Sequence, residues 1–136
     1  MPAFQLCATF DLFPENAQLH TSFSIAGFDF TTLGSNPKIF VNNKGNDCGL
    51  NFPSNGIEIV LPVPLPTVNL RLGTFSGSVD ISAADSSGGV VRKRTIPQLN
   101  RYINVRLSAP EIASLTLTGG GNEAILGHIC VAISVC

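Results

Sequence analysis

The sequence predicts an all-β protein whose strands form a two-layer antiparallel sandwich. In many separate segments apolar and polar residues alternate one by one, the pattern of a strand with one buried face. The 13 glycines and 9 prolines are scattered along the whole chain, as turns between short strands require. No segment has an apolar stripe at the 3.6-residue spacing of a helix. About eight to ten short strands are expected, too many for one open sheet, so two packed layers are favoured.

Length and composition predict a single domain over residues 1–136. Hydrophobic residues make up 44% of the chain and charged residues only 12%, which argues against disorder and predicts a surface of serine, threonine and asparagine. The net charge of −1 gives no global attraction to nucleic acid or to a membrane. No apolar run approaches the length of about 20 residues that a membrane span needs.

The first half of the chain contains four segments with strand character: residues 4–12, 23–30, 38–41 and 57–61. Gly27 interrupts the second of them and predicts a bulge or a bend there. The composition of Asn42 to Gly49 predicts a loop. Pro62, Pro64 and Pro66 cannot donate to a strand ladder, so this stretch is expected to be an extended connector that crosses an edge or passes between the sheets.

The second half continues the alternation as far as the C-terminus. Asp85 to Gly89 predicts a hairpin turn, and Gly119 to Gly121 predicts a corner before the last strand. The inward positions of these strands give the expected core: Val68, Leu70, Leu72, Val79, Ile81, Val105, Leu107, Leu115, Leu117, Val131 and Ile133.

Three motifs in this order give the chain a family resemblance. They are V-x-L-x-L at residues 68–72, D-x-x-G-x-V at residues 85–90 and I-x-S-L-x-L at residues 112–117. With the opening C-x-x-F-acidic motif at residues 7–11, they resemble the galactose-binding-like jelly-roll domains of carbohydrate-binding modules and bacterial surface proteins. The resemblance implies that the sandwich is a jelly roll and that the domain binds a ligand without catalysis.

Such jelly-roll modules often hold a structural calcium ion where the first turn meets the last strand. The resemblance therefore implies a calcium site at Asp11 and Glu123, completed by backbone carbonyl groups of a loop. The alternative is that Asn122 and Glu123 only satisfy backbone N–H groups of the glycine corner.

Most of the positive charge lies in one part of the sequence. Six of the eight cations are Arg71, Arg92, Lys93, Arg94, Arg101 and Arg106. They predict either an anionic partner or a solvated face that protects an edge strand from pairing. Carbohydrate binding usually needs an exposed aromatic platform with planar polar groups, and the chain has one tyrosine and no tryptophan. The candidate ligand-binding residues are Arg92, Arg94, Asn100, Arg101 and Tyr102.

The sequence carries no catalytic signature. It has no G-x-S-x-G elbow and no P-loop, and its cysteines and its two histidines lack the spacing of a zinc site. No ladder of aromatic residues is interleaved with the cations, which argues against nucleic-acid binding. Two hypotheses remain. One is a non-catalytic module that binds a glycan or another surface ligand through loops at one end. The other is a structural or assembly protein, a decoration, shell or fibre subunit, that forms homo-oligomers through low-charge faces.

The four cysteines are Cys7, Cys48, Cys130 and Cys136, which allow three full pairings. In a jelly roll of this type the first and last strands are neighbours, so Cys7 and Cys130 are expected to be adjacent, and bonded if the protein is exported. Met1–Pro2–Ala3 leads directly into strand-like sequence without the pattern of a signal peptide. Either the protein stays inside the cell, or Met1 replaces a signal peptide and the protein is extracellular or surface-associated.

Overall fold

The computed structural model describes residues 3–11, 13, 17–34, 38–42 and 47–134. In these residues the chain forms ten strands and one short 3-10 helix, η1 (Gly120–Asn122). The strands are β1 (Ala3–Thr9), β2 (Ser22–Ile25), β3 (Phe28–Thr32), β4 (Lys38–Asn42), β5 (Asp47–Phe52), β6 (Ile57–Gly73), β7 (Val79–Ala84), β8 (Val90–Ile96), β9 (Tyr102–Gly119) and β10 (Ala124–Ser134). The described pairs are antiparallel, and the prediction of an all-β jelly-roll sandwich is confirmed. No helix in the described part of the chain is long and apolar enough to cross a membrane.

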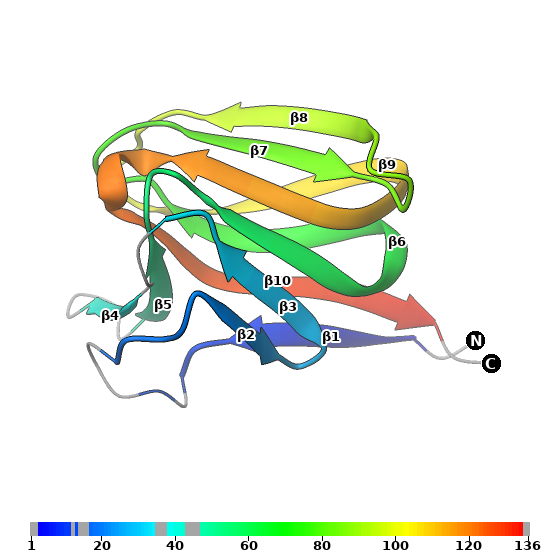
Figure 1. Cartoon of the computed structure of the whole chain (residues 1–136), viewed down its shortest axis with the longest axis horizontal. Helices are drawn as coiled ribbons and strands as arrows, with labels where there is room; N and C mark the ends of the chain where they lie inside the picture. The colour runs from blue at the N-terminus through cyan, green and yellow to red at the C-terminus, as the bar shows by residue number, and fades with distance from the viewer. Residues whose placement is uncertain (1–2, 12, 14–16, 35–37, 43–46, 135–136) are drawn as a thin grey trace.

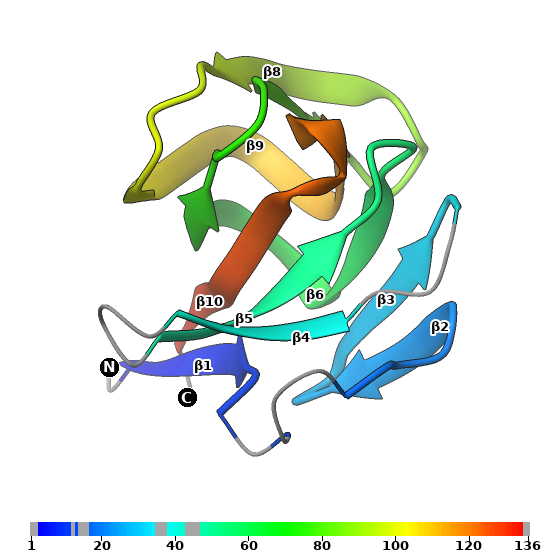
Figure 2. The same cartoon turned by 90° about the vertical axis from the view of Figure 1, so that its left-hand side faces the viewer.

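The strands lie in two layers that share β6 and β9 (Figures 1 and 2). The first layer runs β2–β3–β6–β9–β7–β8 and uses residues 57–60 of β6 and 114–119 of β9. In the second layer β10 pairs on one side with β1 and β5 and on the other with β6. Residues 67–73 of β6 then pair with residues 102–108 of β9.

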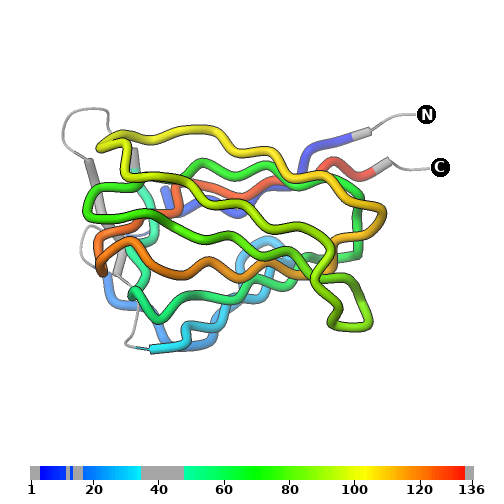
Figure 3. Tube along the Cα trace, turned by 90° about the horizontal axis from the view of Figure 1, so that it is seen from above, coloured from blue at the N-terminus to red at the C-terminus, as the bar shows by residue number. Residues whose placement is uncertain are grey.

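The two long strands pass from one layer to the other at the proline-rich stretch. The register of β6 against β9 shifts between Val60 and Leu65 and again between Leu65 and Thr67, where Pro62, Pro64 and Pro66 lie. Because proline has no N–H to donate, the ladder loosens here and the pair can turn. Figures 1 and 3 show β6 and β9 turning together at one end of the molecule. The predicted passage between sheets is confirmed, although the stretch stays within one strand.

The core lies between the layers. Every residue predicted for it is buried except Ile133, which is partly exposed and packs against the core. Four phenylalanines outside that list are also fully buried: Phe10, Phe28, Phe30 and Phe52. Phe23 stacks on Phe30 with 4.9 Å between the ring centres. Each fully buried phenylalanine side chain contributes about 1.5–3 kcal/mol of burial free energy.

Two local predictions need correction. The loop predicted from Asn42 to Gly49 is wrong at both ends, because Asn42 ends β4 and Asp47 to Gly49 begin β5. These residues pair with β4, so strand pairing outweighs loop composition here. Residues 43–46 of that predicted loop lie outside the described residues. Gly27 does not form a bulge. Ala26 and Gly27 both have positive φ (54° and 85°) and make the two-residue turn that joins β2 to β3.

Candidate ligand-binding surface

Several loops lie at the end of the sandwich opposite the proline bend, and hydrogen bonds of Thr74 connect two of them. This buried residue follows β6, and its carbonyl oxygen accepts hydrogen bonds from the backbone N–H groups of Leu99 (3.2 Å) and Asn100 (2.9 Å). Its hydroxyl donates to the Pro97 carbonyl at 2.8 Å. The loop that leads into β9 is therefore held against the loop that leaves β6, which fixes the start of β9 and the position of Tyr102.

A cluster of three partly exposed side chains, the Tyr102 cluster, lies beside these loops. It consists of Arg71, Phe75 and Tyr102. The guanidinium carbon of Arg71 lies 5.0 Å from the centre of the Tyr102 ring, within the range of a cation–π interaction. Phe75 meets the same ring edge to face, with 5.5 Å between ring centres. Tyr102 is thus contacted on two sides and has a defined orientation.

Two glycines make room for the Tyr102 cluster. Gly73 pairs with Tyr102 across β6 and β9, and a Cβ atom at Gly73 would lie 2.5 Å from Phe75 Cε2 and 3.1 Å from Tyr102 Cε1. Both rings therefore lie close over the strand backbone. A Cβ at Gly127 would lie 3.3 Å from Arg71 Cγ and Cδ, so the stem of Arg71 packs on that glycine. Gly127 sits at the register shift between Leu126 and His128.

Sequence reasoning identified Tyr102 but missed the stacking of Arg71 and the part played by Phe75. Residues 71, 73 and 75 follow each other at intervals of two, which places them on one face of an extended chain. That spacing was the available signal. The partner across the sheet comes from the pairing of β6 with β9, which no local pattern reveals.

Polar side chains continue the surface away from the Tyr102 cluster. Register places Asn104 and His128 in one row with Arg71, and Arg106 and Cys130 in the next row with Asn69. Asn104 and Arg106 are exposed. This outer face of the second layer thus combines one aromatic cluster with planar amide and guanidinium groups.

The residues predicted to bind ligand fall into two groups. Asn100, Arg101 and Tyr102 lie together at the loop end, where the Asn100 carboxamide accepts a hydrogen bond from Gln98 at 2.9 Å. Arg92 and Arg94 lie on β8, in the other layer. Arg94 Nη1 nevertheless reaches the carbonyl oxygen of Arg106 on β9, at 3.5 Å.

The predicted calcium ligands, Asp11 and Glu123, lie after β1 and directly before β10. Among the described residues no group of three or more His, Cys, Asp or Glu side chains is placed to hold a metal ion. The start of β10 pairs with β5, whereas β1 joins β10 only from His128 onward. Glu123 accepts a hydrogen bond from the Ser76 hydroxyl, and the Asn122 side chain accepts one from Ser54 N–H at 2.7 Å. Calcium binding through Asp11 and Glu123 stays a prediction, which melting temperatures in calcium and in EDTA would test.

A groove lies on the outer face of the first layer. Its volume is about 290 Å³, and it is lined by Asp80, Ile81, Ser82, Lys93, Arg94, Thr95, Thr116 and Thr118. Thr95 donates a hydrogen bond to Asp80 across it at 2.6 Å. Half of its lining residues carry short hydroxyl side chains, and no aromatic ring contributes to it.

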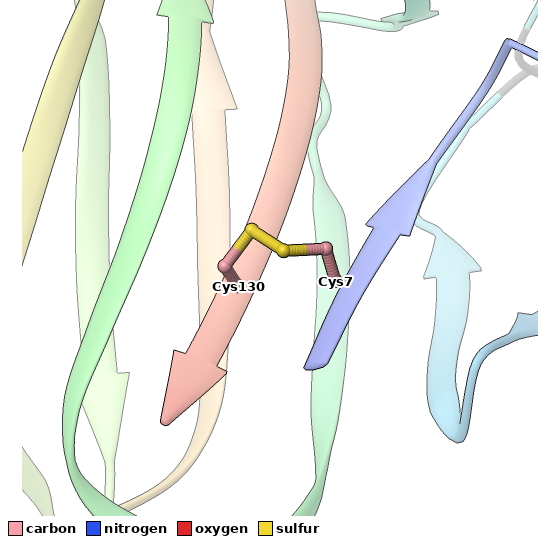
Figure 4. The surroundings of a disulfide bond; sticks show 2 residues. All are labelled: Cys7 and Cys130. Carbon is pink, nitrogen blue, oxygen red and sulfur yellow. A yellow bond between two sulfur atoms is a disulfide. The ribbon is translucent and has the colours of Figure 1, made fainter. Parts of the chain in front are cut away.

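The expected neighbours Cys7 and Cys130 pair directly across β1 and β10 and form a disulfide (Figure 4). Cys130 shares a row with Asn69 and Arg106, so the bond borders the surface described above. Cys48 is free and partly buried, and Cys136 lies outside the described residues.

Comparison with known proteins supports the fold. No family model and no curated protein matches the chain. Among solved structures, a family 29 carbohydrate-binding module from Piromyces equi has a TM-score of 0.57 and 10% identity over 100% of this chain and 94% of that chain. A variant of a second family 29 module, solved with mannohexaose, has a TM-score of 0.57 and 12% identity over 97% of this chain and 93% of that chain. The chain therefore has the jelly-roll sandwich fold seen in carbohydrate-binding modules.

Proposed function

We propose that the protein is a non-catalytic glycan-binding module whose ligand lies on the Tyr102 cluster. The observation that carries the proposal is the arrangement of Arg71 and Phe75 around Tyr102, over a glycine that keeps the rings close to the sheet. The fold shared with carbohydrate-binding modules supports it at the level of architecture.

The chemistry of the surface suits a sugar. The C–H face of a pyranose packs on an aromatic ring, and planar amide and guanidinium groups satisfy its hydroxyl groups with defined geometry. Asn104 and Arg106 supply such groups beside the ring, on the same face of β9. Small-molecule sites generally combine apolar or aromatic contact with a few placed polar groups.

The surface is also held in place before any ligand binds. Thr74 fixes the loop that leads to Tyr102, and the Cys7–Cys130 disulfide joins the neighbouring strands. A rigid site loses less conformational entropy on binding, which favours affinity. Because disulfides persist in oxidising compartments, we infer that the protein matures outside the cytosol.

Tyr102 gives the experiment its signal, since it is the only tyrosine and the chain has no tryptophan. Intrinsic fluorescence therefore reports on this site. A glycan array on the whole protein identifies ligands, and titration of each one should change the fluorescence saturably. Tyr102→Ala should abolish binding measured by calorimetry, whereas Tyr102→Phe, which keeps the ring, should retain most of it. An array without any bound glycan would refute the proposal.

The alternative is a structural subunit that self-associates. It is favoured by large hydrophobic side chains that remain exposed: Phe4 (48%), Leu33 (50%), Val63 (45%) and Val90 (56%). They belong to different parts of the fold, and isolated apolar side chains are common on surfaces. The mass measured by light scattering at micromolar concentration separates the two ideas, because a subunit of an assembly should exceed the monomer mass.

A further inference from the structure

We infer that the ligand is an anionic glycan, carrying carboxylate or sulfate groups, that extends from the Tyr102 cluster across the edge of β9 to Arg92 and Arg94 on β8. This inference rests on the proposed function and specifies the ligand class of the same surface.

The first support is the unusual position of Arg92 and Arg94. Across β7 and β8, Arg94 pairs with Ile81 and Arg92 pairs with Ala83, and both partners are buried in the core. The two arginines thus belong to the core-facing side of β8, yet both are exposed. Since β8 pairs only with β7 among the described strands, it is an edge strand. Its inward side chains project along the open flank of the sandwich.

The second support is that this flank adjoins the Tyr102 surface. Residues 102–108 of β9 pair with β6 on one side and with no described strand on the other. Arg94 Nη1 lies 3.5 Å from the carbonyl oxygen of Arg106 and so bridges the two layers at that edge. Arg106 itself shares its face of β9 with Tyr102 and Asn104. A continuous route therefore leads from the aromatic ring over Arg106 to Arg94 and Arg92.

The third support is the local charge. The chain as a whole has a net charge of −1, but the route is lined by arginines. The acidic residues nearest in sequence make hydrogen bonds elsewhere. Asp80 accepts from Thr95 in the groove on the other face of the sheet, and Asp85 and Glu111 accept from the turn between β7 and β8. A field of one sign along a surface attracts a ligand of the opposite sign.

The type of cation indicates the type of anion. Guanidinium groups present a planar fork that matches the oxygens of a carboxylate or a sulfate. Arg92 and Arg94 are two residues apart on a strand, about 6.6–6.8 Å, so their charges repeat along its direction. Repeated cations beside one aromatic platform fit a chain of acidic sugars better than a single small anion.

The experiment compares polygalacturonate, heparin and the neutral polysaccharide glucomannan, with Tyr102 fluorescence and calorimetry as readouts. The first two probes separate carboxylate from sulfate recognition. One or both should bind at least about ten-fold more tightly than glucomannan, and the affinity should fall as NaCl rises from about 0.02 M to about 0.5 M, because salt screens exposed charges. A single-stranded DNA oligonucleotide serves as a polyanion without sugar hydroxyl patterning. Equal affinity for DNA would overturn the inference in favour of non-specific charge binding.

The test variant carries both Arg92→Gln and Arg94→Gln. Its melting temperature should equal that of the wild type, so that any change in binding does not come from unfolding. It should weaken anionic glycan binding about ten-fold or more, as expected for the loss of two charge-assisted contacts. Lys93→Gln is the matched control, because Lys93 lies between them on β8, so that its side chain belongs to the opposite face of the strand, and it pairs with Ser82 instead of a core residue. Its effect should stay below about two-fold, as expected for an exposed charge that does not contact the ligand. If neutral and anionic probes bind equally well and the arginine changes have no effect, this inference is wrong. The proposed function as a glycan-binding module is then still supported. Binding of none of the probes or array glycans overturns both.

Discussion

Cys7 and Cys130 face each other across β1 and β10 and are joined by a disulfide that links positions 123 residues apart. The bond ties the first strand to the last (Figure 4), and Cys130 lies in one row with Asn69 and Arg106 on the outer face of the second layer. A cross-link across so much of the chain restricts the unfolded state strongly.

Replacing both bonded cysteines by serine should lower the free energy of unfolding by about 2–5 kcal/mol, since the unfolded chain regains the freedom of the closed loop. Urea denaturation followed by circular dichroism measures the change. Cys48→Ser is the control, because Cys48 is free and only partly buried, and it should cost less than the double change. Equal unfolding midpoints for the wild type and the double variant would contradict the prediction.

Much of the fold follows from alternation alone. Leu70, Leu115 and Val131 are inward by pattern and buried in the structure. Alternation also places Cys7 and Cys130 on outward faces, but their adjacency needed the expected order of strands. Tertiary pairing decided what the pattern missed. β5 begins within a stretch of turn-forming residues because Asp47 to Gly49 pair with β4, and β10 pairs with the rest of the strand.

The candidate surface could be predicted only in part. Tyr102 and its neighbours Asn100 and Arg101 were identified because they are close in sequence and chemically suitable. Arg71 joins Tyr102 through the register of β6 against β9, and Arg94 meets Arg106 through the approach of two layers. Both contacts depend on distances across the sandwich, which composition and spacing do not encode.

Truncating the core at Leu117 should be costly. This side chain is 0% exposed and pairs with Ile57 and Ile81 on its two sides. Leu117→Ala should reduce the free energy of unfolding by about 2–5 kcal/mol, from lost burial and a residual cavity. Val90→Ala, at a side chain that is 56% exposed, should change it by less than about 0.5 kcal/mol in the same urea titration. Similar losses for both variants would mean that Leu117 does not lie in a packed core.

The turn between β7 and β8 should show two acidic groups with lowered pKa values. Hydrogen bonds from the Ser87 hydroxyl and from Gly89 N–H hold the pKa of Asp85 below its ordinary value of 3.8. The Ser86 hydroxyl and N–H hold the pKa of Glu111 below 4.5. Carboxyl carbon shifts followed by NMR against pH measure both values. Ser87→Ala should raise the pKa of Asp85 while leaving that of Glu111 low, and Ser86→Ala should raise the pKa of Glu111.

These lowered pKa values also give the direction of a pH effect on stability. A carboxylate whose pKa is lower in the folded state stabilises that state above the pKa of the unfolded chain. The contribution is therefore complete above about pH 4.5 and is lost as the pH falls through the lowered values. Because both groups are exposed, the effect should be small, and the difference in urea midpoint between wild type and Ser87→Ala should shrink on acidification. A difference that grows below pH 4 would contradict the sign.

Gly73→Ala should separate the architecture of the Tyr102 cluster from the stability of the fold. The added Cβ would meet Phe75 Cε2 at 2.5 Å and Tyr102 Cε1 at 3.1 Å, so both rings have to move. The rings are partly exposed and can shift toward solvent, so the unfolding midpoint should change little. Because the rings lose their orientation over the sheet, glycan binding should weaken about three- to ten-fold, a loss of about 0.6–1.4 kcal/mol of binding free energy.

Gly89→Ala is the matched control for that change. At Gly89 the nearest atom to an added Cβ is Asp85 Oδ1 at 3.6 Å, an ordinary contact, and the position lies in the turn between β7 and β8. Near-ultraviolet circular dichroism and Tyr102 fluorescence should change in Gly73→Ala and stay the same in Gly89→Ala. If Gly73→Ala keeps both the wild-type spectrum and the wild-type affinity, then ring placement over Gly73 does not matter for binding. If the spectrum changes while affinity is retained, the ligand does not lie on Tyr102, and the glycan site must be sought elsewhere, first in the hydroxyl-lined groove on the opposite layer.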